Sequence, residues 1–303
     1  MMKVLITGAT GLIGKAIVKQ CRYQNISVHY LTTSRDKIED TENYKGFHWN
    51  PVTQEIDETC FNGVDAIINL AGASISNEWT KKYKQKILNS RLQSLQLLKI
   101  TIKKENIKIK QLISASAIGI YPDSLTNYYD EDFPVVSSSF LGEVSEAWEK
   151  AADDFSDLGI LVTKIRIGLV LDNQEGALPK LMSPIKYGFG TALGSGFQWQ
   201  SWIHINDLAR IFIHTLETNS EGVFNAVAPN PVSNQELTKA IARTLRKPLF
   251  LPNIPTVFLK LILGDMHVLL VESQRVSSNK IEAEGFEFKY PNLLPALEKL
   301  LDF

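Results

Sequence analysis

The first feature that could support chemistry is a group of three glycines near the N-terminus. Gly8, Gly11 and Gly14 stand within Thr7–Gly14, directly after a strand-like run and at the start of a helical pattern. Gly8 permits a tight turn, Gly11 lets the backbone approach a pyrophosphate, and Gly14 lets the helix pack closely on the sheet. The free N–H groups at the helix start would donate to phosphate oxygens. This spacing predicts a dinucleotide site; a Gly-rich turn without a ligand is the alternative.

Charged residues after the second expected strand bear on the choice of dinucleotide. An NAD site usually has an acid here that accepts from the ribose 2′-hydroxyl, whereas an Arg suits a 2′-phosphate. This chain has Ser34 and Arg35 at that point, followed by Asp36 and Lys37. An Arg can hold a phosphate through two parallel hydrogen bonds. We predict a preference for NADP(H). A surface Arg without a ligand is the alternative, and Asp36 leaves room for some NAD binding.

A second group of candidate residues lies near position 200. Trp199 and Trp202 flank two polar residues, and aromatic faces beside amide donors suit a sugar or another flat polar ligand. We therefore predict that both indoles line a substrate wall; core or interface packing is the alternative. His204 alternates with apolar residues, which favours a hydrogen-bonded structural role.

Two further segments have local interpretations. Asn206 and Asp207 are predicted to cap the helix that follows them. Residues Tyr128–Asp132 lie in a long loop, where they form either a mobile lid or a solvated acidic loop.

The elements that must position these residues alternate along the first half of the chain. Strands alternating with helices indicate a Rossmann-type α/β fold, a doubly wound parallel sheet with helices on both faces. We expect strands at Lys3–Thr7, Ser27–Thr32, Ala66–Leu70, Gln111–Ser114 and Ile160–Ile165, and helices at Leu12–Arg22, Thr80–Lys104 and Phe140–Leu158.

The character of the chain changes after about Leu171, where glycines punctuate a loop-rich stretch. This part indicates a small C-terminal α/β cap on the ligand-binding edge of the sheet. We predict a dinucleotide-binding domain over residues 1–225, which includes part of the substrate cleft, and a cap domain over 226–303. Helical patterns recur at Asn206–Glu217, Ser233–Arg246, Pro255–Leu263 and Pro291–Leu301.

Composition narrows the functional classes. The 303 residues include 32 Lys+Arg and 33 Asp+Glu, a net charge of −1, which gives no electrostatic footprint for nucleic acid or an anionic membrane. Cys21 and Cys60 belong to no CxxC, and the five histidines form no paired-ligand spacing, so we expect no metal site. No secretory signal or membrane span is evident, and we expect a cytoplasmic protein with a small-molecule substrate.

Further segments carry a resemblance to a known family. Leu70–Ala73 (Leu-Ala-Gly-Ala) and Ser114–Tyr121, each after a strand, resemble the extended short-chain dehydrogenases/reductases. More narrowly, the chain is similar to the sugar-nucleotide-epimerase-like group labelled "epimerase family protein", whose substrates are mostly unassigned. The closer similarity covers essentially the whole chain and rests on Leu88–Arg91, Gly176–Lys180, Leu193–Gly196, Trp202–Leu208, Ala226–Val232 and Ser273–Val276.

The resemblance implies a set of cofactor positions. Arg91 would reach the pyrophosphate or a ribose, although a solvated helix charge is the alternative for it. The backbone at Leu169 would lie near the nicotinamide. Extended reductases are often dimers, so a homodimer is one expectation. The other implied positions are Gly8, Thr10, Gly11, Leu12, Ile13, Gly14, Ser34 and Arg35, with Leu70 and Ala71 on the adenosine-ribose side.

The chain departs from the family chemistry on one helix. Extended reductases carry a Tyr-x-x-x-Lys pair whose phenolate acts as the base. Here the corresponding positions hold either Phe140 and Val144 or Leu141 and Ser145, so there is no phenol and no amine. Ser116 stands where the family has the serine that holds the substrate hydroxyl.

Three outcomes remain open for the chemistry. Tyr121 or Glu143 could supply the base, although a wall residue and a solvated or ion-paired residue are the respective alternatives. Hydride transfer could also proceed with water and Ser116 alone, or the dinucleotide could be a ligand without turnover. We predict an NADP(H)-binding, epimerase-like oxidoreductase acting on a small polar substrate, with a nucleotide-sugar as one candidate. The alternative is a non-catalytic regulatory or scaffold protein that binds the dinucleotide.

Overall fold

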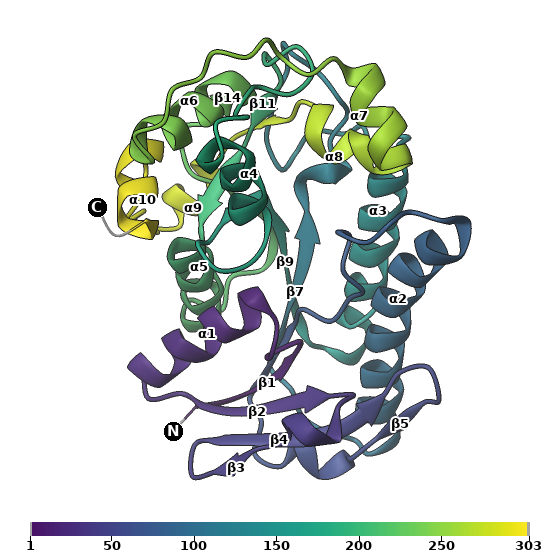
Figure 1. Ribbon diagram of the computed structural model, residues 1–303. Helices are drawn as coiled ribbons and strands as arrows, with labels where there is room; N and C mark the ends of the chain where they lie inside the picture. The colour runs from purple at the N-terminus through teal and green to yellow at the C-terminus, as the bar shows by residue number, and fades with distance from the viewer. Residues whose placement is uncertain (1, 302–303) are drawn as a thin grey trace.

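The computed structural model describes residues 2–301, which are built around one large, mostly parallel β-sheet (Figure 1). In chain order its strands are β1 (Lys3–Thr7), β2 (Ser27–Thr32), β3 (Asp40–Thr41), β4 (Tyr44–Asn50), β5 (Glu55–Ile56), β6 (Ala66–Asn69), β7 (Gln111–Ala117), β9 (Leu161–Ile167) and β13 (Gly222–Ala226). Across the sheet they follow the order β13-β9-β7-β6-β1-β2-β4-β3, with β5 paired to β4. Only β3 and β5 pair antiparallel among these described strands.

Long helices cover both faces of this sheet. Helix α1 packs against α5 on one face, and α2 packs against α3 on the other (Figure 1). Each helix buries an apolar stripe; in α2 it includes Ile87, Leu95 and Leu98. The arrangement confirms the predicted Rossmann-type α/β fold. The helix bounds are α1 (Leu12–Tyr23), α2 (Lys81–Lys104), α3 (Phe140–Asp153) and α5 (Ile205–Glu217).

The elements differ from the sequence prediction at a few points. Strands β4 and β13 were not predicted, and α3 ends at Asp153 rather than at Leu158. A short 3₁₀ turn replaces the last part of that helix, and Gly159 follows it with a φ of 72°, a left-handed conformation that ends helices. Strand β4 mixes aromatic and polar side chains, so its sequence lacks the apolar run that marked the other strands.

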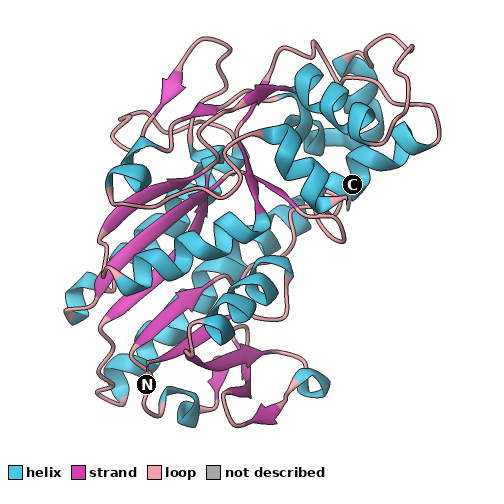
Figure 2. Ribbon diagram, turned by 90° about the vertical axis from the view of Figure 1, so that its left-hand side faces the viewer, coloured by secondary structure: helices cyan, strands magenta, loops and turns pink. Residues whose placement is uncertain are grey.

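The cap lies over the carboxyl ends of the parallel strands. Figure 2 shows its helices gathered at the end of the molecule that holds the C-terminus. It has its own apolar core, which includes Leu178, Trp202, Leu237 and Leu297. Its elements are β10 (Leu169–Leu171) paired with β12 (Trp202–His204), β11 (Trp199–Gln200) paired with β14 (Val232–Ser233), and α4 (Ala177–Lys186), α6 (Asn234–Thr244), α7 (Thr256–Leu263), α8 (Val268–Val271), α9 (Asn279–Ala283) and α10 (Leu293–Leu300).

The predicted lid segment is anchored rather than loose. Tyr128 and Tyr129 form strand β8 (Tyr128–Tyr129), which pairs in parallel with β15 (Arg275–Val276). Tyr129 is fully buried, and its ring stacks on Tyr121. The interpretation of this stretch as a mobile lid is therefore wrong, because a buried tyrosine and a strand pairing hold it in place.

His204 has the structural role that the sequence favours. Its Nδ1 accepts a hydrogen bond from the Asn206 backbone N–H at 3.0 Å, which makes His204 the N-cap of α5, and its ring stacks on Tyr290. The predicted capping by Asn206 and Asp207 is wrong, because both residues lie inside the helix. The Asp207 carboxylate instead accepts from the backbone N–H groups of Lys289 and Tyr290 and fixes the chain before α10.

The buried His204 makes stability depend on pH. Burial lowers the pKa of His204 to about 4 from the ordinary value of 6.5. The unfolded chain takes up a proton between pH 6.5 and pH 4 that the folded chain refuses, so stability falls as the pH drops through this window. Between pH 7 and pH 5, His204 should lower the free energy of unfolding of the wild type by on the order of 2 kcal/mol. His204→Asn keeps a capping side chain but cannot titrate, so this part of the decrease should be absent in the variant. Urea unfolding at both pH values measures this; equal losses in both proteins would contradict it.

Candidate functional site

The turn between β1 and α1 is shaped by close backbone approaches. Gly8 has a φ of +74°, and a Cβ there would lie 3.1 Å from the Leu70 backbone. A Cβ on Gly14 would overlap the Gly8 carbonyl oxygen, so this position excludes any side chain. At Gly11, by contrast, the space beyond its chain neighbours is open in the described structure, with Gly8 O at 3.4 Å. No described side chain caps the start of α1, so its N–H groups remain available to phosphate oxygens.

A buried hydrogen-bond network joins the ends of three neighbouring strands beside this turn. The Thr7 hydroxyl donates to Asn69 Oδ1 at 2.8 Å and accepts from the backbone N–H groups of Leu70 and Ala71. Asn69 Nδ2 then donates to the Ser114 hydroxyl at 3.1 Å. The network fixes the Leu70–Ala71 backbone beside Gly8. We did not single out Thr7 and Asn69 from the sequence; their signal is a polar residue closing an apolar strand run.

The residues expected to select the dinucleotide lie at the carboxyl end of β2, the strand next to β1. The Ser34 backbone N–H donates to Thr32 Oγ1 at 3.2 Å, which turns the chain there. Arg35 follows as the first residue of a 3₁₀ turn and is exposed. Its guanidinium makes no hydrogen bond or ion pair with any residue that the structure describes. A free cation at this edge suits a 2′-phosphate.

Arg91 is not the solvated helix charge that was the alternative for it. Its guanidinium lies against the loop after β6, where a Cβ on Gly72 would come within 3.0 Å of it. Nη1 donates to the carbonyl oxygens of Ala73 and Ile87, and the guanidinium lies 4.7 Å from the Trp148 ring centre. The buried Nε has no partner, and no described acid forms an ion pair with Arg91.

The missing counter-charge has an electrostatic consequence. Desolvation lowers the pKa of Arg91 to about 10, because burial disfavours the cation and no carboxylate offsets that effect. A half-buried cation beside the loop that follows β6 is therefore ready to accept an anionic group. This part of the structure suits a dinucleotide pyrophosphate. It combines an open turn, free backbone N–H groups and an Arg that forms no ion pair with a described acid.

The remaining cofactor positions lie around this turn. Leu12 and Ile13 are half-buried; Leu12 packs against the cap core and Ile13 packs against both the cap core and the sheet core, so α1 starts at the junction of the two. Lys15, one residue beyond the turn, forms an ion pair with Glu175 at 2.7 Å, which holds the segment before α4 over the start of α1. Leu169 begins β10, and its N–H donates to Ser201 O at 2.8 Å. Thr10 is half-buried within the turn.

Ser116 is the first member of a buried polar chain. Its hydroxyl is 2% exposed and donates to Glu149 Oε1 at 2.6 Å. The Glu149 carboxylate accepts two further hydrogen bonds from Arg166, at 2.8 and 2.9 Å. Because the carboxylate holds the hydrogen of Ser116, the serine oxygen is left as an acceptor.

The structure contradicts Tyr121 as a catalytic base. Its hydroxyl donates to Asn225 Oδ1 and accepts from Arg166 Nη1, both at 2.9 Å, and the side chain is 1% exposed. Burial raises the pKa of Tyr121 to about 12, so the phenol stays protonated. Tyr121 is a structural member of the polar chain that starts at Ser116.

Glu143 is also misplaced for the role predicted from the sequence. It lies in the first turn of α3 and is exposed, whereas Val144, Ser145 and Glu149 on that helix are buried. At about 100° per residue, Glu143 lies far around the helix from Glu149, the residue that contacts Ser116. Glu143 therefore lies away from the Ser116–Glu149 contact, and its role as a base stays a prediction that this geometry does not favour.

The helix face that carries the family's Tyr and Lys is apolar in this chain. Val144 is buried with Trp79 and Ile87, and Leu141 packs at the edge of the same cluster. Met266 and Leu269, from the segment leading into and through α8, pack against it from the cap. Where the family has a phenol and an amine, this chain therefore has apolar side chains that pack against α2 and the cap.

The two tryptophans have different environments. Trp202 is fully buried in the cap core, and its Nε1 donates to Asn230 O at 3.0 Å, so its assignment to a substrate wall is wrong. Trp199 is half-buried; its Nε1 donates to Leu125 O, and the Arg275 guanidinium lies 4.5 Å from its ring centre. A substrate role for Trp199 stays a prediction.

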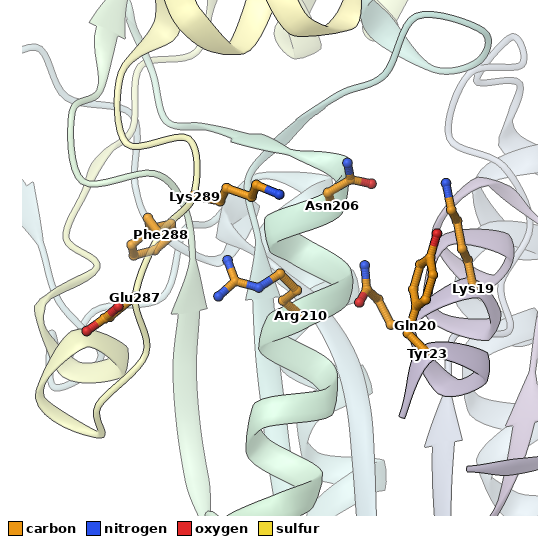
Figure 3. A pocket seen from close by; sticks show the side chains of 8 residues that line it. All are labelled: Lys19, Gln20, Tyr23, Asn206, Arg210, Glu287, Phe288 and Lys289. Atoms are coloured by element: carbon orange, nitrogen blue, oxygen red, sulfur yellow. The ribbon is translucent and has the colours of Figure 1, made fainter. Parts of the chain in front are cut away.

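A pocket of about 610 Å³ lies away from all these residues. Figure 3 shows side chains of α1 on one side of it, with α5 and residues 287–289 on the other. None of the predicted site residues lines this pocket, so it is separate from the predicted dinucleotide site. The described residues also contain no group of three or more His, Cys, Asp or Glu side chains placed to hold a metal.

Comparison with known sequences agrees with this geometry. The profile of the NAD dependent epimerase/dehydratase family matches residues 4–227, and a domain of unknown function (DUF1731) matches residues 254–300. An epimerase family protein of Staphylococcus aureus (strain MRSA252) is 37% identical over 302 residues, 99% of each chain. One of Staphylococcus haemolyticus (strain JCSC1435) is 37% identical over 306 residues, the full length of both chains.

Solved structures extend the comparison. The human epimerase family protein SDR39U1 (isoform 2), crystallised with NADPH, matches with a TM-score of 0.86 and 30% identity over 99% of both chains. A nucleoside-diphosphate sugar epimerase from Corynebacterium glutamicum matches with a TM-score of 0.78 and 28% identity over 99% of this chain and 58% of that one. With a family profile over most of its length and full-length relatives of this identity, the chain belongs to the NAD dependent epimerase/dehydratase family as an epimerase family protein.

Proposed function

We propose that this chain binds NADP(H) and acts as an epimerase-like oxidoreductase on a small polar substrate, with a nucleotide-sugar as one candidate. The observation that carries the proposal is the exposed, unpartnered Arg35 at the end of β2, one strand from the open glycine turn. A relative of 30% identity that was crystallised with NADPH supports the same dinucleotide.

Each group of site residues is assigned to one part of the dinucleotide. The N–H groups from Thr10 to Ile13 receive the pyrophosphate, and Arg91 offsets its charge from the side of α2. The fixed backbone of Leu70–Ala71 lies beside the adenosine ribose, while Ser34 and Arg35 take the 2′-phosphate. The backbone at Leu169, at the start of β10, borders the nicotinamide.

The chemistry of the site rests on Ser116. When bound, the dinucleotide supplies or accepts a hydride at its nicotinamide ring. Ser116 donates its hydrogen to Glu149, which leaves its oxygen to accept from a substrate hydroxyl and orient that group; because Ser116 is buried in this structure, substrate binding must first expose this oxygen. Because Tyr121 stays protonated and Glu143 lies elsewhere on α3, water accepts the hydroxyl proton. Catalysis of this kind rests on positioning more than on a strong base.

A second candidate function is binding of the dinucleotide without turnover, as in a regulatory or scaffold protein. The apolar packing around Val144 and Leu141 favours it, because the helix face that normally supplies the proton carrier offers none. Three other expectations remain predictions: the division into 1–225 and 226–303, a cytoplasmic location and a homodimer. None of the described helices is long and apolar enough to cross a membrane.

The choice of dinucleotide is tested at Arg35. If its guanidinium holds the 2′-phosphate, Arg35→Ala costs roughly 1.5–3 kcal/mol of NADPH affinity, the range for a charged hydrogen bond, and leaves NADH affinity almost unchanged. Fluorescence titration with both nucleotides measures the difference, and Lys108→Ala, an exposed cation elsewhere, is the control. Equal losses for NADPH and NADH would rule out direct contact with the 2′-phosphate.

Arg91 is tested by a variant of similar volume. Arg91→Met removes the charge that faces the pyrophosphate, which both nucleotides share, so their affinities should fall alike by about tenfold or more. The free energy of unfolding of the ligand-free protein should fall by only about 1–2 kcal/mol, because two hydrogen bonds to carbonyl oxygens are lost while the cost of burying an unpaired cation is removed. Lys103→Met on the same helix is the control. A selective loss of NADPH binding would place Arg91 at the 2′-phosphate instead.

Turnover is tested at Ser116. Ser116→Ala should lower the rate of NADPH-linked conversion at least tenfold with any substrate found by screening polar alcohols and carbonyl compounds (~10²-fold is typical of a lost positioning or proton-transfer group). NADPH affinity should stay within about twofold, since Ser116 is assigned to the substrate. Ser156→Ala, an exposed serine, is the control. Unchanged turnover in Ser116→Ala would remove Ser116 from the chemistry.

A further inference from the structure

The cap exposes an unusual group of large apolar side chains at α7 and the loop before it. Val257, Leu261 and Ile262 are 77%, 81% and 76% exposed, and Phe258 is 56% exposed. Phe250 and Leu251, in the preceding loop, are 70% and 40% exposed. We refer to these six residues as the tip surface. Figure 1 shows α7 at the outer edge of the cap, away from the strand ends that carry the cofactor residues.

The tip surface is part of an ordered framework. Thr191 Oγ1 donates to Pro252 O at 2.6 Å, and Leu193 bridges to Ile254, so the loop is tied to the segment after α4. That segment adds Tyr187 and Phe189, which are 78% and 67% exposed. The apolar side chains therefore project from fixed backbone. Exposed apolar side chains of this size, gathered on linked segments, mark a surface that meets another apolar phase.

Charge is distributed unevenly along the sequence of the cap. The chain as a whole carries 32 Lys+Arg and 33 Asp+Glu. Residues 176–206 and 237–264, which contain α4, most of α6 and all of α7, hold seven Lys and Arg residues and no Asp or Glu. However, Glu236 and Asp265 directly border the second of these stretches. The seven are Lys180, Lys186, Lys239, Arg243, Arg246, Lys247 and Lys260.

We propose that the tip surface binds the surface of an anionic lipid bilayer, with Phe250, Phe258, Leu261 and their neighbours entering the headgroup region. A cationic stretch of sequence that carries these apolar side chains, residues 237–264, matches the chemistry of such an interface, where lysines remain in the headgroups while their stems lie along apolar surface. Lys260, within α7 itself, is placed for this role. Binding would be peripheral, since the described helices include no membrane span.

Two other occupants fit less well. A second copy of the chain would pair this surface with itself in a symmetric dimer and would place the cationic segments opposite one another. An acidic protein would satisfy the charge. However, side chains that are about three-quarters exposed protrude, and a fluid bilayer accepts protruding side chains without a matching groove. The positive and negative charges of the whole chain nearly balance, and for that reason no membrane contact was expected from the sequence. This overall balance does not reveal the local excess of positive charge near α7.

The experiment is flotation of the purified full-length protein with vesicles of phosphatidylcholine alone or with phosphatidylglycerol added. We expect binding to the anionic vesicles, weak binding to the neutral ones, and release at high salt. The double variant Leu261→Gln, Ile262→Gln should reduce partitioning about tenfold or more, and Lys260→Glu should reduce it on anionic vesicles only. Val52→Gln changes a residue that is 74% exposed in another part of the molecule and should have no effect.

Three results would overturn the proposal: no binding to either vesicle, equal binding of the double variant and the wild type, or equal binding to neutral and anionic vesicles. A dimer in analytical ultracentrifugation that the double variant dissociates, without vesicle binding, would assign the surface to a second copy. Unchanged NADPH affinity and unfolding midpoint in the double variant show that it folds, so that a loss of flotation reports on the tip surface.

Discussion

The close contact between α1 and β1 at Gly14 is the constraint on which the site depends. No Cβ fits between this position and the Gly8 carbonyl, so the helix can begin directly at the strand end only with glycine there. That contact brings the free N–H groups of α1 to the edge of the sheet. The Thr7 hydroxyl, hydrogen-bonded to Asn69, fixes the facing Leu70–Ala71 backbone. Close contacts in space therefore set both sides of the turn, the start of α1 and the Leu70–Ala71 backbone. A dinucleotide would meet groups that are already in position.

Two arginines show how differently buried charge is used. Arg166 is matched by the Glu149 carboxylate through two hydrogen bonds, and this pair holds Ser116 and Tyr121 in one polar chain. Among residues 2–301, no acid forms an ion pair with Arg91, and its Nε has no partner. A balanced pair stabilises a fold or positions other groups, whereas an unbalanced cation at a ligand edge favours an incoming anion. This contrast supports cofactor binding near Arg91 and a positioning role for the Glu149–Arg166 pair.

The sequence predicted the features that depend on neighbours along the chain. The glycine turn, the strands β1 and β2 and the helix α2 follow from local spacing, and the structure has them within a residue or two. Features that depend on distant residues could not be predicted in this way. Trp202 is buried because Asn230 and the cap core surround it, and Tyr121 is locked by Asn225 and Arg166, which lie far along the chain. The position of Glu143 could not be predicted either, because packing decides which face of α3 meets Ser116.

The central claim is that the edge of the sheet near Gly11 and Arg35 forms a site for NADP(H). Isothermal titration calorimetry of the unmodified protein with NADPH and then with NADH tests it most directly. We expect micromolar binding of NADPH and binding of NADH at least about tenfold weaker, since only NADPH carries the 2′-phosphate and a contact worth about 1.4 kcal/mol is a factor of ten. Binding of neither nucleotide, or equal binding of both, would contradict it.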